Sequence, residues 1–371
     1  MTTTLPVDTL RNLVTAIFSA AGCGSEEAGQ IADNLVDANL TGHDSHGVIR
    51  LPRYLDWLRD GTLKAGQRVS VITESETMAL LDGQLGFGQS IGPQAVALGI
   101  EKARQAGIAI VGLRRAGHLG RIGAWAEMAC EAGLLSIHMV NVAGSILVAP
   151  FGGTERRLAT NPLAIGVPRP GAPPLILDFA TSLVAEGKLQ VALSGGKPLN
   201  EDALIDFDGS LSRDPRLFYG TGEIAEAAAG RDGSAAIRPM GAHKGSGLSF
   251  MIELLAGALT GSGCCGPGEK TLWNGMLSIY LKPDAFADDE ADPKAGFAEE
   301  VERFIGFFTS ARPAEPGGEV LLPGQPEQRS REKRLAEGIP LPDETVAALR
   351  NAAEGLGIER EQLNSLLTSV P

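Results

Sequence analysis

Cysteine, histidine and aromatic residues are all scarce in this chain of 371 residues. The four cysteines, two of them adjacent, contain no CxxC pair, so we expect a reducing cytoplasm rather than a disulfide framework or a zinc site. The first residues, MTTTLPVDTL, lack a basic segment followed by an apolar one, and we expect no signal peptide. The longest apolar run, Leu248 to Leu259, is too short to cross a bilayer and contains Glu253, so no membrane partner is expected.

Basic residues are in the minority, because 32 lysines and arginines stand against 45 aspartates and glutamates, which gives a net charge of -13. This balance argues against a nucleic-acid partner, since phosphates require a basic face. An anionic substrate would have to be held by a few locally placed arginines or lysines. The length and the hydrophobic share of 43% predict a packed core in two domains, or in one large domain with an attached lobe.

Two of the five histidines lie in one short stretch, Thr41 to Arg53, which reads TGHDSHGVIRLPR. An imidazole can exchange a proton with a hydroxyl near neutral pH, and a guanidinium can hold a carboxylate through two parallel hydrogen bonds. His46 followed by Arg50 therefore suits the oxidation of a 2-hydroxy acid. A structural alternative stays open, in which Gly42 ends one helix and the arginines of the next helix are solvated.

Helices flank this stretch on both sides. Two amphipathic helices are predicted before it, the first capped by Asp8 and the second capped by Ser25 and ending near Gly42. A third is predicted from Arg50 to Asp60. Other helices are predicted over residues 121–132, 183–192, 248–260, 295–310, 329–337 and 342–354, and strands over 68–72, 134–140, 163–167, 175–179 and 276–281.

A strand, a glycine turn, a helix and a second strand follow one another between residues 77 and 113, which is the order of a Rossmann unit. The turn, from Gly86 to Gly92, has the spacing GxGxxxG instead of GxGxxG. The second strand ends in Arg114 and Arg115, where an acid would be needed for a ribose. We therefore predict that the glycines only allow a tight entry to the helix, although the arginines could still meet a nucleotide phosphate.

A second candidate for phosphate binding is the turn Gly241 to Gly247, which contains Lys244 and precedes an apolar helix. Backbone N–H groups and an ammonium at a helix start form a good phosphate site. The segment is not a P-loop, because GxxxxGK[ST] is absent. The alternative is a flexible glycine entry to a buried helix.

Motifs along nearly the whole chain carry a family resemblance. They are SHGVIRLPRY (Ser45 to Tyr54), GHLG (Gly117 to Gly120), PFGG (Pro150 to Gly153), ATNPLAIGVP (Ala159 to Pro168), LDFATS (Leu177 to Ser182), HKGSGLS (His243 to Ser249) and LPGQPE (Leu322 to Glu327). With these motifs, in this order, the chain resembles the malate/L-lactate dehydrogenase type 2 family. This family of NAD(P)-dependent oxidoreductases also includes enzymes acting on sulfolactate, ureidoglycolate, diketogulonate and cyclic imino acids.

The resemblance implies an α/β fold of three layers, α/β/α, with a mixed sheet, a dinucleotide site that is not of the Rossmann type, and a helical lobe built from both termini. We expect an N-terminal helical segment (residues 1–75), an α/β core (76–284) with the nicotinamide-cofactor domain at about 119–284, and a C-terminal helical segment (285–371). The resemblance also implies a homodimer. The substrate would be a small carboxylic acid, with malate and lactate as the default pair.

The same resemblance assigns catalytic and substrate-binding roles. His46, positioned by Ser45, would give or take the proton at the substrate oxygen, and Arg50, with Tyr54 beside it, would bind the substrate. His118 is the other candidate for the acid/base, or it stacks near the nicotinamide. Close alternatives are reduction of a cyclic imino acid, of a sugar-derived keto acid or of a ureidoglycolate-type substrate. A nucleotide-binding protein without catalysis is the alternative from another class.

The resemblance places NAD or NADP against a further set of residues, and it requires no metal. They are Asn141, Thr160, Asn161, Pro162, Asp178, Phe179, Ala180, Ser182, His243, Lys244, Gly324, Gln325 and Glu327. Lys244 would meet a phosphate oxygen. Asp178 would hold the nicotinamide ribose or amide, or orient a catalytic histidine; a capping role is less favoured because Thr181 and Ser182 already supply capping groups. Two residues depart from the family pattern, Ser246 in place of an aromatic residue and Glu186 before Gly187, and both bear on the substrate and on the NAD or NADP choice.

Overall fold

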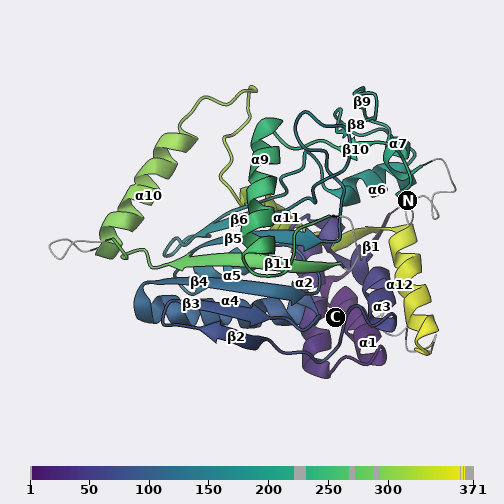
Figure 1. The fold of residues 1–371 in the computed structure, drawn as a ribbon, viewed down its shortest axis with the longest axis horizontal. Helices are drawn as coiled ribbons and strands as arrows, with labels where there is room; N and C mark the ends of the chain where they lie inside the picture. The colour runs from purple at the N-terminus through teal and green to yellow at the C-terminus, as the bar shows by residue number, and fades with distance from the viewer. Residues whose placement is uncertain are drawn as a thin grey trace.

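The computed structural model describes residues 2–220, 231–266, 272–286, 293–359, 361 and 363. Its centre is a seven-stranded sheet in the order β2-β3-β4-β11-β5-β6-β7 (Figure 1). The strands are β2 (Ser70–Glu74), β3 (Met78–Asp82), β4 (Ile108–Ala116), β5 (Leu135–Ala143), β6 (Leu163–Val167), β7 (Leu175–Phe179) and β11 (Trp273–Leu281). Only β3 and β4 pair in parallel, and the other neighbours are antiparallel. The predicted mixed sheet is confirmed.

Helices cover both faces of this sheet. On one face, α4 (Gly88–Ala106) and α5 (Gly123–Glu131) bury apolar side chains such as Ile91 and Val96 against Val111 and Leu113 of β4. On the other, α9 (His243–Ile252) continues into a π-helical turn, η3 (Glu253–Ala258), that packs on β5 and β11. The predicted three-layer arrangement is therefore confirmed (Figure 1).

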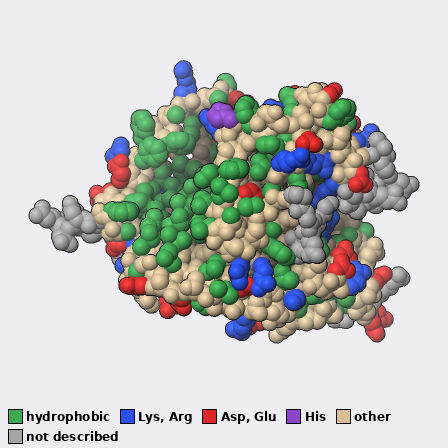
Figure 2. All heavy atoms as spheres, in the orientation of Figure 1, with side chains coloured by type: hydrophobic (Ala, Val, Ile, Leu, Met, Phe, Trp, Pro, Cys, Tyr) green, Lys and Arg blue, Asp and Glu red, His purple; other side chains and the backbone are tan. Residues whose placement is uncertain are grey.

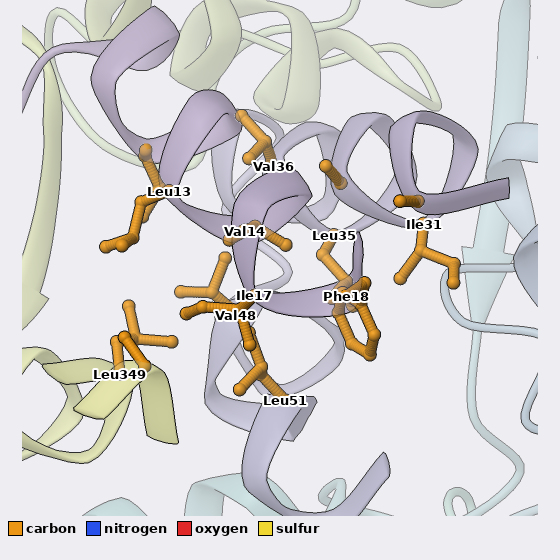
Figure 3. Close-up of a cluster of buried hydrophobic side chains, with 14 of the residues drawn as sticks. Leu13, Val14, Ile17, Phe18, Ile31, Leu35, Val36, Val48, Leu51 and Leu349 are labelled. Carbon is orange, nitrogen blue, oxygen red and sulfur yellow. The ribbon is translucent and has the colours of Figure 1, made fainter. Parts of the chain in front are cut away.

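A helical lobe joins the two ends of the chain. It contains α1 (Val7–Ala20), α2 (Ser25–Leu40), η1 (Asp44–His46), η2 (Val48–Arg50), α3 (Leu51–Arg59) and α12 (Asp343–Gly355). Strand β1 (Thr2–Leu5) pairs antiparallel with β12 (Ile339–Pro342). Figure 3 shows Ile17 of α1, Leu35 of α2 and Leu349 of α12 in one buried cluster. Burial of these apolar faces holds the N-terminal helices, and with them the histidine stretch, against the C-terminal part.

The remaining elements form smaller units around the sheet. They are α6 (Glu186–Ser194), α7 (Arg216–Tyr219), the three-stranded sheet of β8 (Leu204–Ile205), β9 (Leu211–Ser212) and β10 (Ala236–Ile237), and the helices α10 (Pro293–Thr309) and α11 (Gln325–Glu337). Leu189, Phe218 and Ile237 belong to the core of the unit built on α6, α7 and the small sheet. Within the described part of the chain, no helix is both long and apolar enough to cross a bilayer.

Both predicted helix caps are wrong. Helix α1 starts at Val7 after Pro6, so Asp8 lies inside its first turn, where its carboxylate accepts a hydrogen bond from Arg11. Helix α2 starts at Ser25 itself, after Gly24. Pro6 and Gly24 adopt the extended geometry that precedes a helix, with ψ of 145° and 155°, so the chain turns into each helix without a capping side chain.

Several other boundaries differ from the predictions, and three of them concern predicted site residues. Asn141 lies inside β5, which continues to Ala143 because β11 pairs with it along its whole length. Helix α11 begins at Gln325 rather than near Arg329, since Pro326 occupies its first turn, a position that proline favours. Helix α9 begins at His243, so Lys244 is its second residue.

Strands β3 and β4 of the strand–helix–strand unit pair in parallel. The arginines at the end of β4 bind a carboxylate of the protein itself. The Nε atoms of Arg114 and Arg115 donate to Asp82 Oδ2 at 3.0 and 2.9 Å. Asp82 is buried at the end of β3. An ion pair with a buried carboxylate accounts for both arginines, as expected for charges at a strand end.

Candidate active site

One pocket of about 1290 Å³ is lined jointly by the helical lobe, the sheet and α6. It brings together many of the residues that the sequence predicts for the site. These are Ser45, His46, Arg50, His118, Thr160, Pro162, Asp178, Phe179, Ala180, Ser182 and Glu327. Seven others do not line it, namely Tyr54, Asn141, Asn161, His243, Lys244, Gly324 and Gln325.

The histidine stretch is held by a buried asparagine at the end of α2. Asn39 Nδ2 donates to Asp44 Oδ1 at 2.7 Å, and Asn39 Oδ1 accepts the Val48 N–H at 2.9 Å. A Cβ at Gly47 would lie 2.2 Å from Asn39 Oδ1, so only glycine allows this close approach. Arg334 of α11 binds both oxygens of Asp44, at 2.6 and 3.0 Å. These contacts fix the backbone immediately before His46.

His46 and His118 face each other in the pocket. Their ring centroids are 5.5 Å apart and their planes differ by 5°. Ser45 Oγ lies 3.2 Å from His46 Nδ1, and Arg50 Nε donates to the Ser45 carbonyl at 2.6 Å. A Cβ at Gly187 would lie 2.2 Å from Ser45 Cβ, so α6 can only close this side of the pocket because it has glycine there.

Both rings are neutral in the free protein. Burial lowers the pKa of His46 well below its usual value of 6.5, and the neighbouring His118 and Arg50 add to this. Burial, with Arg50 second, also lowers the pKa of His118 to about 3. A neutral imidazole is the form that can accept the proton of a hydroxyl.

His118 is supported from behind by two buried side chains. The Tyr54 hydroxyl is 2.6 Å from His118 Nδ1, and Gln89 Nε2 lies 3.1 Å from both the Tyr54 hydroxyl and the His118 carbonyl oxygen. Tyr54 is 1% exposed and contacts the histidine rather than the pocket. Sequence reasoning missed Gln89, because a lone glutamine in a helix carries no signal of a distant partner.

Arginines dominate the charge on the lobe side of the pocket. Arg231 forms a two-fold ion pair with Glu186, at 2.5 and 2.9 Å, which neutralises the charge that departs from the family pattern. Arg53 also lines the pocket, and within the described residues it has no ion-pair partner. Burial first, and Arg231 second, lower the pKa of Arg53. Arg50 and Arg53 are therefore cations available to an anionic ligand.

Asp178, at the end of β7, accepts the Gly123 N–H through Oδ2 at 2.8 Å. Gly123 is the first residue of α5, so the carboxylate binds a backbone N–H at the start of that helix. Burial raises the pKa of Asp178. The described structure shows no hydrogen bond from Asp178 to a histidine, and its role toward a nicotinamide stays a prediction.

Asn141 and Asn161 converge on a buried glutamate beneath the pocket. Their Nδ2 atoms donate to Glu253 at 3.0 and 2.8 Å, and the Cys265 N–H donates to the same carboxylate at 2.9 Å. Glu253 lies at the start of the π-helical turn η3. The amide nitrogens of Asn141 and Asn161 thus donate their hydrogen bonds to groups inside the protein. A contact of these residues with a cofactor stays a prediction.

The remaining predicted cofactor residues lie outside the pocket wall. His243 and Lys244 are exposed at the start of α9, and the His243 ring packs edge-on to Phe151 with centroids 5.9 Å apart. The Ser246 hydroxyl accepts the Phe151 N–H at 2.9 Å, so this departure from the family pattern ties α9 to the PFGG loop. Gly324 lines a second pocket of about 770 Å³ that shares Asp178 and Glu327 with the first.

An ion-pair network that the sequence did not reveal borders both pockets. Arg121 is buried and donates to Asp37 at 2.8 Å and to Glu127 at 2.6 Å. Arg331 binds the same two carboxylates. The network joins α2, α5 and α11, so it fixes the wall between the pockets. Its members are far apart in sequence and have no shared motif.

Known proteins that resemble this chain include dehydrogenases of small 2-hydroxy acids. A family model described as malate/L-lactate dehydrogenase matches residues 5–350. Hydroxycarboxylate dehydrogenase B of Escherichia coli (strain K12) is 36% identical over 363 residues, covering 96% of this chain and 95% of that protein. Malate dehydrogenase of Pyrococcus abyssi (strain GE5 / Orsay) is 35% identical over 361 residues, with coverages of 96% and 95%.

Solved structures agree with the sequence relatives. The structure of a putative malate/lactate dehydrogenase from E. coli has a TM-score of 0.89 and 34% identity, and the match covers 99% of this chain and 100% of that one. The delta1-piperideine-2-carboxylate reductase from Pseudomonas syringae has a TM-score of 0.76 and 31% identity, with coverages of 95% and 100%. With the family model spanning nearly its full length, this chain belongs to the malate/L-lactate dehydrogenase family.

Proposed function

We propose that the protein is an NAD(P)-dependent oxidoreductase that interconverts a small 2-hydroxy acid and the corresponding 2-keto acid. The observation that carries the proposal is the meeting of His46, His118 and Arg50 in one pocket. Relatives named as malate, L-lactate and L-sulfolactate dehydrogenases support the reaction class. In this reaction Arg50 binds the carboxylate and His46 exchanges the proton of the substrate oxygen.

The pocket fits a nicotinamide dinucleotide next to a small acid. Its volume of about 1290 Å³ exceeds the roughly 300–1,000 Å³ that is usual for a single ligand. Thr160, Phe179 and Glu327 line it and would hold the cofactor, with the Asp178 carboxylate beside them. The described residues contain no cluster of three metal-binding side chains. The bound nicotinamide would accept hydride from carbon 2, or return it.

The chain's own residues handle the proton and the substrate anion. Arg50 is oriented by its hydrogen bond to the Ser45 carbonyl, so its two terminal nitrogens remain for a carboxylate. Neutral His46 can take the hydroxyl proton during oxidation, and Ser45 Oγ can accept the N–H at Nδ1 when the ring becomes charged. Helix α6 and the lobe line the pocket in which this step would take place.

A second candidate activity is reduction of a cyclic imino acid, favoured by the structural match to a delta1-piperideine-2-carboxylate reductase. Arg50 would still hold the carboxylate, and the proton would go to nitrogen instead of oxygen. The test is absorbance at the reduced-nicotinamide band while purified protein is offered keto acids and cyclic imines. Cofactor binding without turnover of any compound would contradict both activities and favour a nucleotide-binding protein without catalysis.

We also propose a homodimer that works in the cytoplasm. Phe250, Met251 and Leu254 are exposed on α9 and η3, and Phe304 and Phe307 on α10. Figure 2 shows hydrophobic side chains gathered over this part of the molecule. A second copy of the chain would cover this patch. Light scattering of the wild type and of Leu254→Asp tests the dimer, and a monomeric wild type would contradict it.

The proposed cytoplasmic location is supported by the four cysteines. All four are free, as is usual in a reducing compartment.

A further inference from the structure

The hydrogen bonds behind His118 bear on which of the two pocket histidines moves the proton. Tyr54 and Gln89 are both buried, and together they contact the ring and the backbone of His118. Neither residue lines the pocket that holds His46 and Arg50. Because His118 Nδ1 is taken by Tyr54, Nε2 is the ring nitrogen left for a ligand in the pocket.

The orientation of the Gln89 amide follows from the atom that it faces. The His118 carbonyl oxygen has no proton and can only accept a hydrogen bond. The Gln89 atom 3.1 Å away must therefore be the NH₂ nitrogen, since an amide oxygen there would place two acceptors against each other. The same nitrogen lies 3.1 Å from the Tyr54 hydroxyl. One of its protons goes to the carbonyl, and the other goes to the hydroxyl.

The direction of the Tyr54 hydrogen bond follows in turn. Its oxygen accepts from Gln89, so its own proton needs an acceptor, and His118 Nδ1 at 2.6 Å is the acceptor that the structure provides. The opposite arrangement, with Nδ1–H donating, would leave the buried hydroxyl proton without a partner. Burial raises the pKa of Tyr54 to about 12, so the hydroxyl keeps this proton at neutral pH. The neutral His118 ring then carries its hydrogen on Nε2.

We propose that Gln89 and Tyr54 are positioning residues that hold His118 in the Nε2–H form, so that His118 donates a hydrogen bond to the substrate oxygen and His46 transfers the proton. The catalytic half of this inference rests on the proposed function, while the state of the ring does not. A neutral imidazole with hydrogen on Nε2 and an occupied Nδ1 has no free lone pair for the hydroxyl proton. In the oxidation, the O–H bond of the substrate breaks and the proton binds His46 Nε2. His118 keeps its own proton throughout and stabilises the charge on the oxygen.

The direct test is NMR of the protein labelled with ¹⁵N-histidine, with each signal assigned from single His→Gln variants. The protonated nitrogen of His118 is expected to be Nε2 in the wild type. Tyr54→Phe removes the donor to Nδ1, and the spectrum should shift to a mixture of both neutral forms. Tyr280→Phe is the matched control, because this buried tyrosine packs 5.5 Å from His138 and its loss should leave the His118 signals unchanged. A wild-type His118 with hydrogen on Nδ1 would overturn the proposal, whatever the activity of the protein.

Kinetics test the division of roles. Glutamine can offer an N–H near the position of Nε2 but cannot take a proton at neutral pH. His118→Gln should therefore keep at least about a tenth of kcat with an unchanged pH profile, whereas His46→Gln should lose about 10²–10⁴-fold. The reverse pattern would overturn the assignment. Absence of turnover in the wild type would contradict the proposed function alone, since the NMR result would still decide the state of His118.

Discussion

Arg53 offers a way to distinguish a dicarboxylic substrate from a monocarboxylic one. It lies one helical turn after Arg50, lines the same pocket and has no ion pair within the described residues. Burial lowers the pKa of Arg53, which shows that the guanidinium is already partly desolvated in the fold. Less desolvation free energy is therefore lost when a ligand binds it. We predict that Arg53 binds the second carboxylate of a malate-type substrate, while Arg50 binds the carboxylate next to the reacting carbon.

The perturbation is Arg53→Met, which keeps an apolar stem next to Trp57 and removes the charge. Two unit charges about 4 Å apart attract by roughly 4 kcal/mol at an effective dielectric constant of about 20. Arg53 is partly exposed, and solvent screening reduces this to roughly 2–3 kcal/mol. Since about 1.4 kcal/mol corresponds to a factor of ten, kcat/KM for oxaloacetate should fall about 30- to 150-fold.

The assay compares kcat/KM for oxaloacetate and for pyruvate, followed through the reduced nicotinamide. Pyruvate has no second carboxylate, so its value should change by less than about three-fold. Arg59→Met in the last turn of the same helix is the control, because this exposed arginine pairs with Asp56 at the surface. Equal losses for both substrates would show that Arg53 acts on the fold. No loss for oxaloacetate would refute the second anion site.

Three further predictions follow from the site. His46 is neutral above its lowered pKa, so kcat/KM for oxidation should stay flat between about pH 6 and 8. Reduction needs the charged ring, so kcat/KM for reduction should fall about ten-fold per pH unit over the same range. Opposite slopes in rate assays would contradict this. Arg50→Lys should raise KM and also lower kcat, because an ammonium cannot copy two parallel hydrogen bonds; unchanged kinetics would exclude Arg50 from the substrate. Glu253→Ala should lower the free energy of unfolding in urea by roughly 3–5 kcal/mol, since buried donors lose their acceptor, whereas the exposed Glu300→Ala should change it by less than about 0.5 kcal/mol.

The sequence predicted best what is local in the chain. Helix and strand periods placed most elements within a few residues, and the Ser45 to Arg53 stretch was found because its polar groups are contiguous. The helix starts were missed at Asp8 and Ser25, where the geometry of Pro6 and Gly24 already turns the chain. Proline fixes φ at Pro6, whereas glycine imposes no such restriction at Gly24, so the two missed caps have different backbone origins.

What the sequence could not predict depends on partners far along the chain. Gln89 is separated from His118 by 29 residues, and Asn141 from Glu253 by 112. A glutamine or an asparagine has the same appearance in a sequence whether it binds a cofactor or satisfies a buried group. The motif therefore indicated that Asn141 and Asn161 matter, and only the fold shows that their amide nitrogens hold Glu253 beneath the pocket.

Helix α11 explains why a segment near the C-terminus is needed for a site that begins near residue 43. Its first turn brings Glu327 to within 3.4 Å of His43, its middle brings Arg331 to Asp37, and its end brings Arg334 to both oxygens of Asp44. The three contacts lie along one face of the helix, at spacings of four and three residues. They act on the backbone that carries His46, while Arg331 also reaches the carboxylate that binds Arg121 at the pocket wall. The pairing of β1 with β12 holds the two ends of the chain together, so the lobe positions the histidine stretch from both termini.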